Sequence, residues 1–252
     1  MTQFDVVIPA GGTIDASYVA LMGSPCRALA PLGIDKEPVL QQVVNALRDS
    51  GIIRRVIVVA PDAVQQVISG VDLWLPAGPS GAENIQAGLA EANPDAPVLV
   101  CASDLPLITA ESVSDFLAHC QPEAQIAAGL VSEADYNKAS PDAPPSQFVQ
   151  LADTGPVTMS GLFLVHPKLL IQQSARFDSM FAARKDQWRM ASLLGPRLLW
   201  GWATHTLSLR TVTARAETLL SAPVQIITNV SPLLAYDIDT ADDYTYANRR
   251  FK

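Results

Sequence analysis

The sequence predicts an α/β fold in which a mostly parallel sheet is covered by helices on both faces. Short β-branched runs alternate with helical patterns through the first half of the chain, which is typical of strand–helix–strand units. One of these runs, residues 98–102, is almost purely apolar, as a central strand buried on both faces should be. The chain has 252 residues, of which 49% are hydrophobic and 17% charged, so it can build the large core that such a sheet needs.

Strands are expected where apolar, β-branched runs end at turn residues. In chain order, the expected ranges are 4–9, 56–59, 73–75, 98–102, 126–131, 158–165 and 224–227. One helix is expected from Pro38 to Gly51, because apolar residues recur on one helical face between them. Ser80 and Glu83 have the spacing of a capping box, which predicts a helix through residue 89. Further helices are expected from Pro61, from Thr109 and over residues 240–251.

The second half of the chain contains two less regular stretches. Residues 136–147 are polar and contain three prolines, which predicts a loop long enough to face a substrate. Residues 167–220 have a helical pattern with a break at Gly195-Pro196. No internal repeat or linker marks a second domain, so residues 1–252 are expected to form a single domain with a helical insertion or lid at about 167–222.

Composition and charge exclude several classes of function. The 17 Lys and Arg residues against 25 Asp and Glu residues give a formal charge of −8, and no basic run could neutralise the phosphates of a nucleic acid polymer. No stretch reaches the roughly 20 apolar residues of a membrane span. The first residues lack the basic flank of a secretory signal, which predicts a cytoplasmic protein. Three cysteines without a CxxC pair support neither a disulfide framework nor a zinc site.

A glycine-containing turn, Ala10-Gly11-Gly12-Thr13, follows the first expected strand. In parallel α/β sheets, ligands bind beyond the carboxyl ends of the strands, where helix N-termini offer free backbone donors. The turn lacks the GxGxxG pattern of dinucleotide-binding folds, and the chain contains no GxxxxGK[ST] P-loop. By itself, the pair of glycines fits a tight turn as well as a ligand site.

Three aspartates are candidate metal ligands. Asp104 follows the most apolar strand, where a lone carboxylate would be costly to bury without a partner. Asp237 and Asp239 are two residues apart, so in an extended chain both lie on one face while Ile238 points to the core. Gathered in one cleft, these carboxylates would attract a divalent cation, and Mg²⁺ suits oxygen ligands combined with a phosphate substrate. On spacing alone, unrelated surface aspartates explain the pattern equally well.

Four segments, in order along the chain, resemble the MobA-like nucleotidyltransferases: VIPAGG at 7–12, PCRALAPLG at 25–33, CASDLPLIT at 101–109 and DIDTADD at 237–243. The resemblance implies a glycosyltransferase-A-type fold, a three-layer α/β/α sandwich with a mostly parallel mixed sheet, as in nucleotide-diphospho-sugar transferases. It implies that an NTP binds over the N-terminal half and a small phosphorylated acceptor over the C-terminal half. An acceptor phosphate would attack the α-phosphorus of the NTP and release pyrophosphate.

The resemblance also implies roles for residues at matching positions. Asp104 would coordinate Mg²⁺, and Asp239, with Asp237 beside it, would complete the metal site. Arg27 stands where the family has a catalytic lysine. The base and the triphosphate would be held by residues of two segments: Ala10, Gly11, Gly12, Thr13, Ser80, Gly81 and Asn84.

On the acceptor side, Ser160 and Gly161 resemble part of the family's acceptor pocket. The pair Arg184-Lys185 resembles a basic pair in one branch of the family, so Lys185 would hold the acceptor's phosphate. A solvated helix face explains this basic pair as well.

The glycine loop departs from the family pattern, because residues 13–26 contain no basic side chain. The arginine that usually braces the triphosphate is therefore missing, and the guanidinium of Arg27 is not equivalent to the compact ammonium of a lysine. Three hypotheses follow. The retained aspartates favour a Mg²⁺-dependent nucleotidyltransferase, and the missing arginine favours a catalytically degenerate nucleotide-binding protein. A nucleotide-sugar-dependent glycosyltransferase of the same fold is the third.

Overall fold

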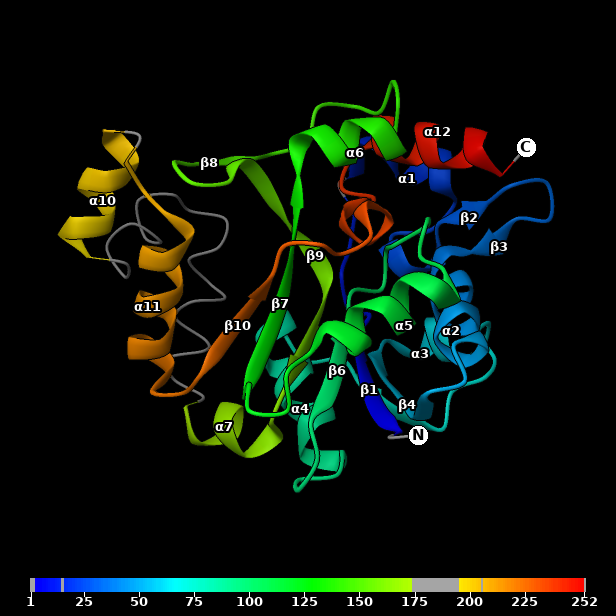
Figure 1. The fold of residues 1–252 in the computed structure, drawn as a ribbon. Coiled ribbons are helices and arrows are strands. Elements are labelled where there is room, and N and C mark those ends of the chain that lie inside the picture. The colour runs from blue at the N-terminus through cyan, green and yellow to red at the C-terminus, as the bar shows by residue number, and fades with distance from the viewer. Residues whose placement is uncertain (1–2, 15, 174–194, 205, 252) are drawn as a thin grey trace.

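An eight-stranded mixed sheet forms the centre of the molecule, and helices cover both of its faces (Figure 1). The computed structural model describes residues 3–14, 16–173, 195–204 and 206–251. The strand order is β10-β7-β9-β6-β1-β4-β5, with β8 paired to β9. The strands are β1 Phe4–Pro9, β4 Ile53–Ala60, β5 Leu73–Pro76, β6 Val98–Cys101, β7 Ile126–Ser132, β8 Val149–Leu151, β9 Gly155–Val165 and β10 Val224–Ile227. Strands β2 (Pro31–Leu32) and β3 (Glu37–Pro38) form a separate small hairpin.

Most neighbouring strands of the large sheet are parallel. β1 pairs in parallel with β4 and with β6, β4 with β5, and β7 with β10. β9 is the exception, because it runs antiparallel to both β6 and β7. The predicted three-layer α/β/α sandwich with a mostly parallel mixed sheet is therefore confirmed.

The helices have the bounds α1 Ala16–Met22, α2 Val39–Asp49, α3 Asp62–Gln65, α4 Gly81–Glu91, α5 Ala110–His119, α6 Glu133–Ala139, α7 Pro167–Gln172, α10 Pro196–Ala203, α11 Leu209–Leu220 and α12 Ala241–Arg250. Two short 3-10 helices, η1 (Arg27–Leu29) and η2 (Pro232–Ala235), lie in connecting segments. Among the described residues, no helix combines the length and the apolar character needed to cross a membrane.

Different helices cover the two faces of the sheet. Successive side chains of a strand point to opposite faces, so Val7 of β1 belongs to a buried cluster with Leu89 of α4, while Val6 belongs to a cluster with Leu40 of α2. Helix α4 lies so close to the sheet that a Cβ atom on Gly88 would come within 2.3 Å of Val7. The glycine thus permits the close approach that sets the position of α4 over β1.

The sheet changes its direction of growth beside β1, because β4 and β5 are added on one side of β1 while β6 lies on the other. In open α/β sheets, ligands bind at the carboxyl ends of the strands at such a point. The turn containing Gly11 and Gly12 follows β1, and Asp104 follows β6. The topology therefore brings both sequence-predicted segments to one end of the sheet.

The second half of the chain corrects one prediction. The loop expected over 136–147 is wrong for residues 136–139, because α6 continues through them. Ser132 stabilises the start of α6, since its Oγ accepts a hydrogen bond from the Asp135 N–H at 3.1 Å and donates one to the Asp135 carboxylate at 2.6 Å. The helical character expected over 167–220 is confirmed for α7, α10 and α11. Residues 174–194, which include Arg184 and Lys185, lie outside the described residues.

Candidate active site

The turn after β1 is hydrogen-bonded to the segment that contains Arg27. The backbone N–H of Arg27 donates a hydrogen bond to the carbonyl of Gly12 at 3.1 Å, and the N–H of Ile14 donates to the carbonyl of Pro25 at 3.0 Å. These reciprocal bonds join residues 12–14 to residues 25–27 as two short antiparallel segments. The backbone of Arg27 is therefore fixed beside the glycine turn.

Gly11 lies against the first turns of α4. A Cβ atom at Gly11 would lie 2.6 Å from Nδ2 of Asn84. Asn84 is only 3% exposed, and its Oδ1 accepts a hydrogen bond from the backbone N–H of Gly78 at 2.7 Å. Because this short, buried side chain cannot move without breaking that bond, position 11 requires glycine. The contact joins the two segments that were predicted to bind the nucleotide.

Ser80 is the N-cap of α4, as predicted, but the reciprocal half of the predicted capping box is wrong, because the Glu83 carboxylate bonds to the Ser80 hydroxyl and not to the Ser80 backbone N–H. Ser80 Oγ accepts a hydrogen bond from the Glu83 N–H at 3.2 Å and donates one to the Glu83 carboxylate at 3.1 Å. Gly81 is the first residue of this 11-residue helix. Ser80 thus begins the helix, and the same end of the helix carries Asn84 to the glycine turn.

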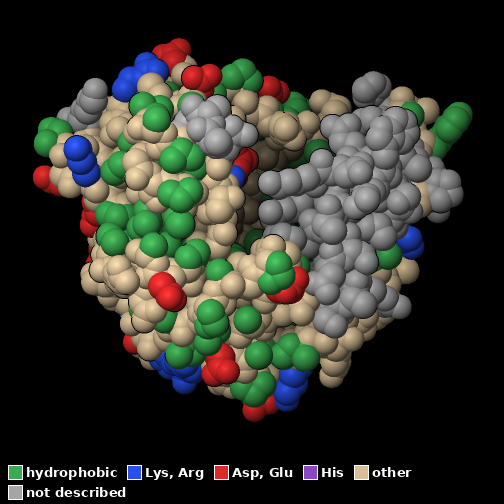
Figure 2. All heavy atoms as spheres, turned by 180° about the vertical axis from the view of Figure 1, so that it is seen from behind, with side chains coloured by type: hydrophobic (Ala, Val, Ile, Leu, Met, Phe, Trp, Pro, Cys, Tyr) green, Lys and Arg blue, Asp and Glu red, His purple; other side chains and the backbone are tan. Residues whose placement is uncertain are grey.

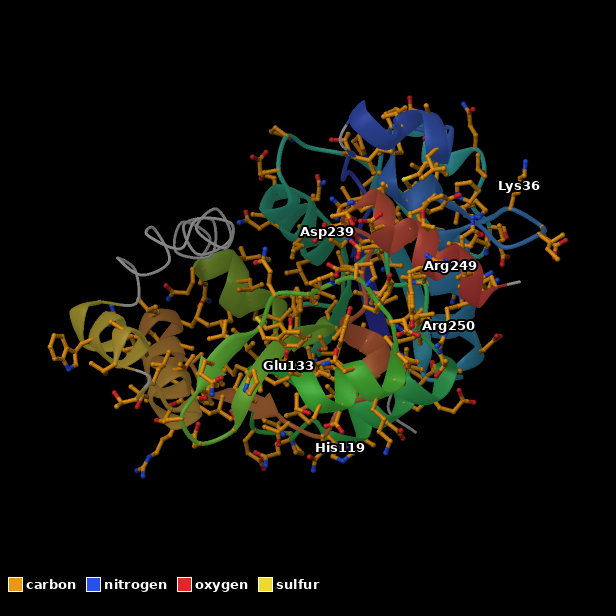
Figure 3. The ribbon with its side chains drawn as sticks, turned by 90° about the horizontal axis from the view of Figure 1, so that it is seen from above. Lys36, His119, Glu133, Asp239, Arg249 and Arg250 are labelled. Atoms are coloured by element: carbon orange, nitrogen blue, oxygen red, sulfur yellow. The ribbon has the colours of Figure 1, made fainter. Side chains whose placement is uncertain are left out.

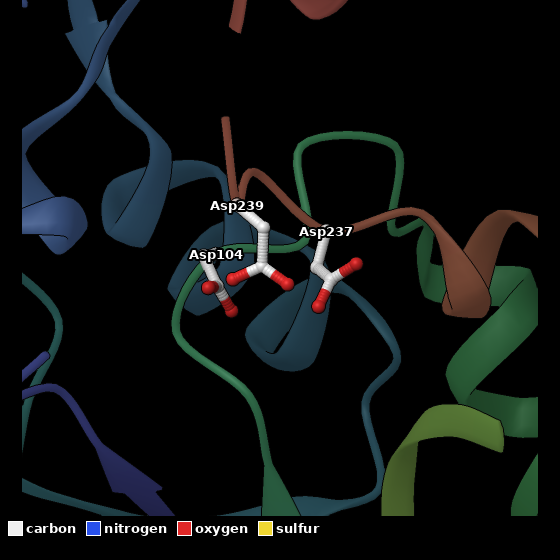
Figure 4. Close-up of side chains that lie close together, drawn as sticks. All are labelled: Asp104, Asp237 and Asp239. Carbon is white, nitrogen blue, oxygen red and sulfur yellow. The ribbon is translucent and has the colours of Figure 1, made fainter. Parts of the chain in front are cut away.

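Three carboxylates meet at the carboxyl end of β6. Oxygen atoms of Asp104, Asp237 and Asp239 lie within 4.8 Å of one another, and Figure 4 shows their carboxylates turned toward a common space. In the view from above, the labelled Asp239 lies toward the centre of the molecule, whereas Lys36 and His119 lie at its periphery (Figure 3). Hard oxygen donors in such a group can hold a divalent cation such as Mg²⁺.

The alternation around Asp237 and Asp239 agrees with the sequence prediction. Tyr236 and Ile238 are buried, while the aspartates between and after them are exposed. The Ile238 N–H donates a hydrogen bond to the backbone carbonyl of Asp104 at 3.2 Å, which ties this segment to the end of β6. The buried ring of Tyr236 stacks on Tyr136 with ring centroids 6.2 Å apart. These contacts set where the two exposed carboxylates lie.

Arg27 joins the carboxylate cluster through a single nitrogen atom. Its Nη1 donates to Asp104 Oδ2 at 2.9 Å and to Asp239 Oδ1 at 2.5 Å. The side chains of Arg27 and Asp104 are 19% and 10% exposed, whereas that of Asp239 is 58% exposed. Among the described residues, one positive charge therefore faces three carboxylates that come from two separate segments of the chain.

The surroundings disfavour the ionised forms of Asp104 and Asp237. Burial raises the pKa of Asp104 above its ordinary value, while the guanidinium of Arg27 opposes this shift. Desolvation in the cleft, followed in size by the negative charges of Asp104 and Asp239, raises the pKa of Asp237 to about 7. A cation placed among the three carboxylates would offset this repulsion.

A cavity of about 270 Å³ lies next to the cluster and includes Asp237 in its wall. The face seen from behind is hollowed, and acidic (red) and basic (blue) side chains meet inside the hollow (Figure 2). The other lining residues are mainly apolar, with three hydroxyls: Pro9, Ile85, Val100, Ala102, Leu105, Ser146, Thr158, Met159, Ser160, Gly161, Phe163, Leu234 and Ala235. None of these described lining residues carries a positive charge.

A bulge in β9 shapes one wall of the cavity. The pairing between β7 and β9 shifts register at Gly129, opposite residues 160–162. Ser160 is buried and its Oγ donates to the carbonyl of Leu162 at 3.0 Å, so the bulge itself uses the hydroxyl proton. A Cβ atom at Gly161 would lie 2.7 Å from Leu105, the residue after Asp104. The bulge thus packs against the segment that carries Asp104.

The fold brings together most of the residues that were predicted as a site. The glycine turn meets Asn84, Arg27 meets Asp104 and Asp239, and the two acceptor-side residues line the cavity beside Asp237. Lys185 lies outside the described residues. Ser146, in the cavity wall, belongs to the stretch that was expected to be a loop facing a substrate. Sequence reasoning missed three other cavity residues, Thr158, Phe163 and Leu234, of which Thr158 carried a usable signal because it lies two residues before Ser160 on the same strand.

Comparisons with known proteins concern the fold and the family of the chain. A family model, the MobA-like NTP transferase domain, matches residues 6–224 and therefore ends before Asp237. A structure described as a hypothetical transferase from Thermus thermophilus superposes with a TM-score of 0.84 at 24% identity, over 96% of this chain and 100% of that one.

Two further solved structures share the fold at lower similarity. The 2-C-methyl-D-erythritol 4-phosphate cytidylyltransferase of Thermus thermophilus gives a TM-score of 0.57 at 16% identity, over 99% of each chain. Rv0371c of Mycobacterium tuberculosis H37Rv gives 0.59 at 18% identity, over 98% of this chain and 99% of that one. No curated protein matches the sequence.

Proposed function

The chain belongs to the MobA-like NTP transferase domain family, and from this premise we propose that it is a Mg²⁺-dependent nucleotidyltransferase. It transfers NMP from an NTP to a small phosphorylated acceptor. An oxygen of the acceptor phosphate forms a bond to the α-phosphorus, the bond between the α-phosphorus and the bridging oxygen breaks, and pyrophosphate leaves. The observation that carries the proposal is the group of Arg27 and three carboxylates beside the glycine turn, at the switch point of the sheet.

The nucleotide would bind over the turn at residues 10–13. Gly11 allows close approach of the turn to α4, and free backbone N–H groups at a turn and a helix N-terminus bind phosphate oxygens well. Ser80, Gly81 and Asn84 would contact the base. We propose the neighbouring cavity for the acceptor, because Ser160 and Gly161, which resemble part of the family's acceptor pocket, lie in its wall.

The carboxylates fit a magnesium ion in chemistry and in spacing. Asp104, Asp237 and Asp239 offer hard oxygen ligands, and Mg²⁺ with ligands at about 2.1 Å joins oxygens up to about 4.2 Å apart. The oxygens lie within 4.8 Å of one another, so a shared ion would draw the carboxylates closer together. When bound, Mg²⁺ supplies positive charge to the phosphates during transfer.

Among the described residues, Arg27 provides a positive charge of the protein at the site. The negative charge that develops on the leaving pyrophosphate needs fixed cations, which account for most of the catalysis in phosphoryl transfer. Arg27 is anchored through Gly12, in the same turn that would hold the triphosphate. We therefore assign to Arg27 the stabilisation of that charge.

A second candidate is a nucleotide-binding protein without transferase activity. It is favoured by one observation, namely that residues 13–26 contain no basic side chain, so Arg27 is the first cation after the glycine turn and it is engaged by two carboxylates. On this hypothesis the protein still binds a nucleotide, but the positive charge at the site is too small to promote transfer.

One assay separates the two candidates. The purified protein is incubated with Mg²⁺, each of the four NTPs and a panel of polyol, sugar and pterin phosphates, and pyrophosphate release is followed. Release that needs an acceptor and stops in EDTA supports the enzyme. A nucleotide that raises the melting temperature without any release supports the binding protein. Asp104→Asn serves as the negative control.

A further inference from the structure

We propose that Arg27 is a resident counter-cation, which keeps free divalent metal away from Asp104 and Asp239 until the phosphates of a nucleotide draw its guanidinium away. The inference rests on the proposed function, because the metal and the nucleotide are those of the same site. It adds an order to their binding. The metal is admitted together with the nucleotide rather than before it.

The position of Nη1 is the first observation behind this proposal. This nitrogen lies 2.9 Å from Asp104 Oδ2 and 2.5 Å from Asp239 Oδ1, and so it fills the gap between the two oxygens. An ion that bridged the same oxygens at about 2.1 Å would need that gap. The guanidinium and the metal therefore exclude each other in this arrangement.

Charge gives the same result as geometry. A bound metal must replace Arg27 as the partner of two carboxylates, one of which is buried and accepts a charge-assisted hydrogen bond. The energy of those ion pairs is lost when free metal enters. Free metal should thus bind weakly, even though three carboxylates face one another.

The phosphates of a nucleotide offer the guanidinium another partner. The backbone of Arg27 is hydrogen-bonded to Gly12 in the turn that would hold the triphosphate. A guanidinium binds phosphate oxygens through the same planar fork that binds carboxylates. Residues 13–26 provide no other basic side chain, so Arg27 is the cation of this segment that can serve both partners in turn. Phosphate and metal then help each other to bind, and linkage makes this help reciprocal, at roughly 5–150-fold.

The direct test is the affinity of the metal-free protein for Mn²⁺, measured from the electron paramagnetic resonance signal of free Mn²⁺ without nucleotide. Arg27→Gln is expected to bind Mn²⁺ roughly 5–150-fold more tightly than the wild type. Arg54→Gln is the matched control, because Arg54 pairs with Asp5 at the other end of the sheet. It should bind Mn²⁺ as the wild type does.

Two outcomes of this titration overturn the proposal. The first is Arg27→Gln with an affinity equal to or weaker than that of the wild type. The second is tight binding that persists in the Arg27→Gln/Asp104→Asn double variant, since the metal would then lie elsewhere. If Arg27→Gln does not fold, Arg27→Met decides the question, because its flexible, uncharged side chain fills space without supplying a cation. An affinity no tighter than wild type would then refute the proposal.

Thermal unfolding gives a readout that needs no metal titration. In EDTA, Arg27→Gln should melt below the wild type, because its carboxylates have lost their counter-cation. Excess Mn²⁺ should raise the melting temperature of this variant more than that of the wild type. An equal or smaller rise would contradict the proposal.

Tripolyphosphate tests the part played by phosphates. In calorimetric titrations, the affinities of the wild type and Arg27→Gln for the Mn²⁺–tripolyphosphate complex should differ less than their affinities for free Mn²⁺, because only the wild type gains a new partner for its guanidinium. A difference in affinity as large as that measured for free Mn²⁺ would contradict the proposed movement of Arg27 to the phosphates.

Pyrophosphate release distinguishes a failure of this proposal from a failure of the proposed function. If the wild type releases pyrophosphate while Arg27→Gln binds Mn²⁺ with unchanged affinity, the proposed role of Arg27 alone is refuted. If Arg27→Gln binds Mn²⁺ more tightly while the wild type releases no pyrophosphate, the proposed enzyme activity alone is refuted.

Discussion

The two ends of the central sheet each carry a buried aspartate paired with an arginine, and the two pairs differ in balance. At the amino end of β1, Asp5 accepts hydrogen bonds from Arg54 Nε and Nη2, both at 2.9 Å, and from the Asn93 N–H at 3.1 Å. At the carboxyl end of β6, Asp104 shares one nitrogen of Arg27 with Asp239. In the first pair, one guanidinium binds one carboxylate through two nitrogens. In the second, one guanidinium nitrogen is shared by two carboxylates, so among the described residues there are more negative than positive charges.

The groups around a buried carboxylate therefore indicate its role better than its exposed fraction does. A carboxylate matched by one arginine has a structural role, whereas one that shares its arginine with other carboxylates has a functional role. Asp5 and Asp104 are 3% and 7% exposed, so burial alone does not tell them apart. Only Asp104 has further carboxylates and a cavity beside it. We expect substitutions at the amino end to change stability and substitutions at the carboxyl end to change activity.

The largest expected effect is that of Asp104→Asn on activity. The change removes a proposed metal ligand and should lower pyrophosphate release by about 10²–10³-fold, the size seen when one group that stabilises transition-state charge is lost. The melting temperature should stay near that of the wild type, because burial already opposes the charge of Asp104. Unchanged release would remove Asp104 from the site.

The matched substitution, Asp5→Asn, should act on stability instead. It replaces two charge-assisted bonds from Arg54, and the expected loss is about 2 kcal/mol of unfolding free energy in urea titrations. Arg54 can turn to solvent, since its side chain is 47% exposed. Release per folded molecule should remain that of the wild type. A large loss of activity at full stability would break the contrast between the two ends.

A smaller effect is expected for Gly11→Ala, with Gly12→Ala as its control. The new methyl at position 11 would lie 2.6 Å from Asn84 Nδ2 and force that amide away from Gly78, whereas a methyl at position 12 meets no atom within 4 Å. Without ligand, Gly11→Ala should lose about 1–2 kcal/mol of unfolding free energy. Gly12→Ala should stay within about 0.5 kcal/mol of the wild type. Equal stabilities would show that the turn is loosely packed.

The smallest expected effect is that of Asp237→Asn on the pH dependence of the unfolding free energy, measured in EDTA. The folded protein raises the pKa of Asp237 to about 7, so ionisation of this group favours unfolding as the pH rises from about 4 to about 7. The variant cannot ionise, and its stability advantage over the wild type should grow across that window and then stay constant. Because Asp237 is exposed, we expect about 1 kcal/mol or less. If the stability advantage of Asp237→Asn became smaller as the pH rises, the raised pKa of Asp237 would be contradicted.

Much of the fold followed from the sequence because apolar periodicity and helix caps are local. The buried strand β6, the helix start at Ser80 and the alternation around Ile238 all appear as predicted. Helix α6 was missed over residues 136–139, because three nearby prolines suggested a loop while the Ser132 cap went unnoticed. Small elements such as β8 carry too few residues for a periodic signal.

The site was predictable only in part, since its members meet through tertiary contacts. Spacing suggested that Asp237 and Asp239 share a face, but nothing local indicated that Arg27 would bridge Asp104 and Asp239. The bulge at Ser160 likewise depends on the register between β7 and β9. Its packing against Leu105 could not be read from either segment alone.

The most direct test of the account is a crystal structure of the protein with Mn²⁺ and a non-hydrolysable NTP, with the metal located by anomalous diffraction. The account predicts a peak bonded to Asp104 and Asp239, with the guanidinium of Arg27 moved from these carboxylates to the phosphates. A nucleotide bound with Arg27 still bridging the two carboxylates, and with the metal elsewhere or absent, would contradict it.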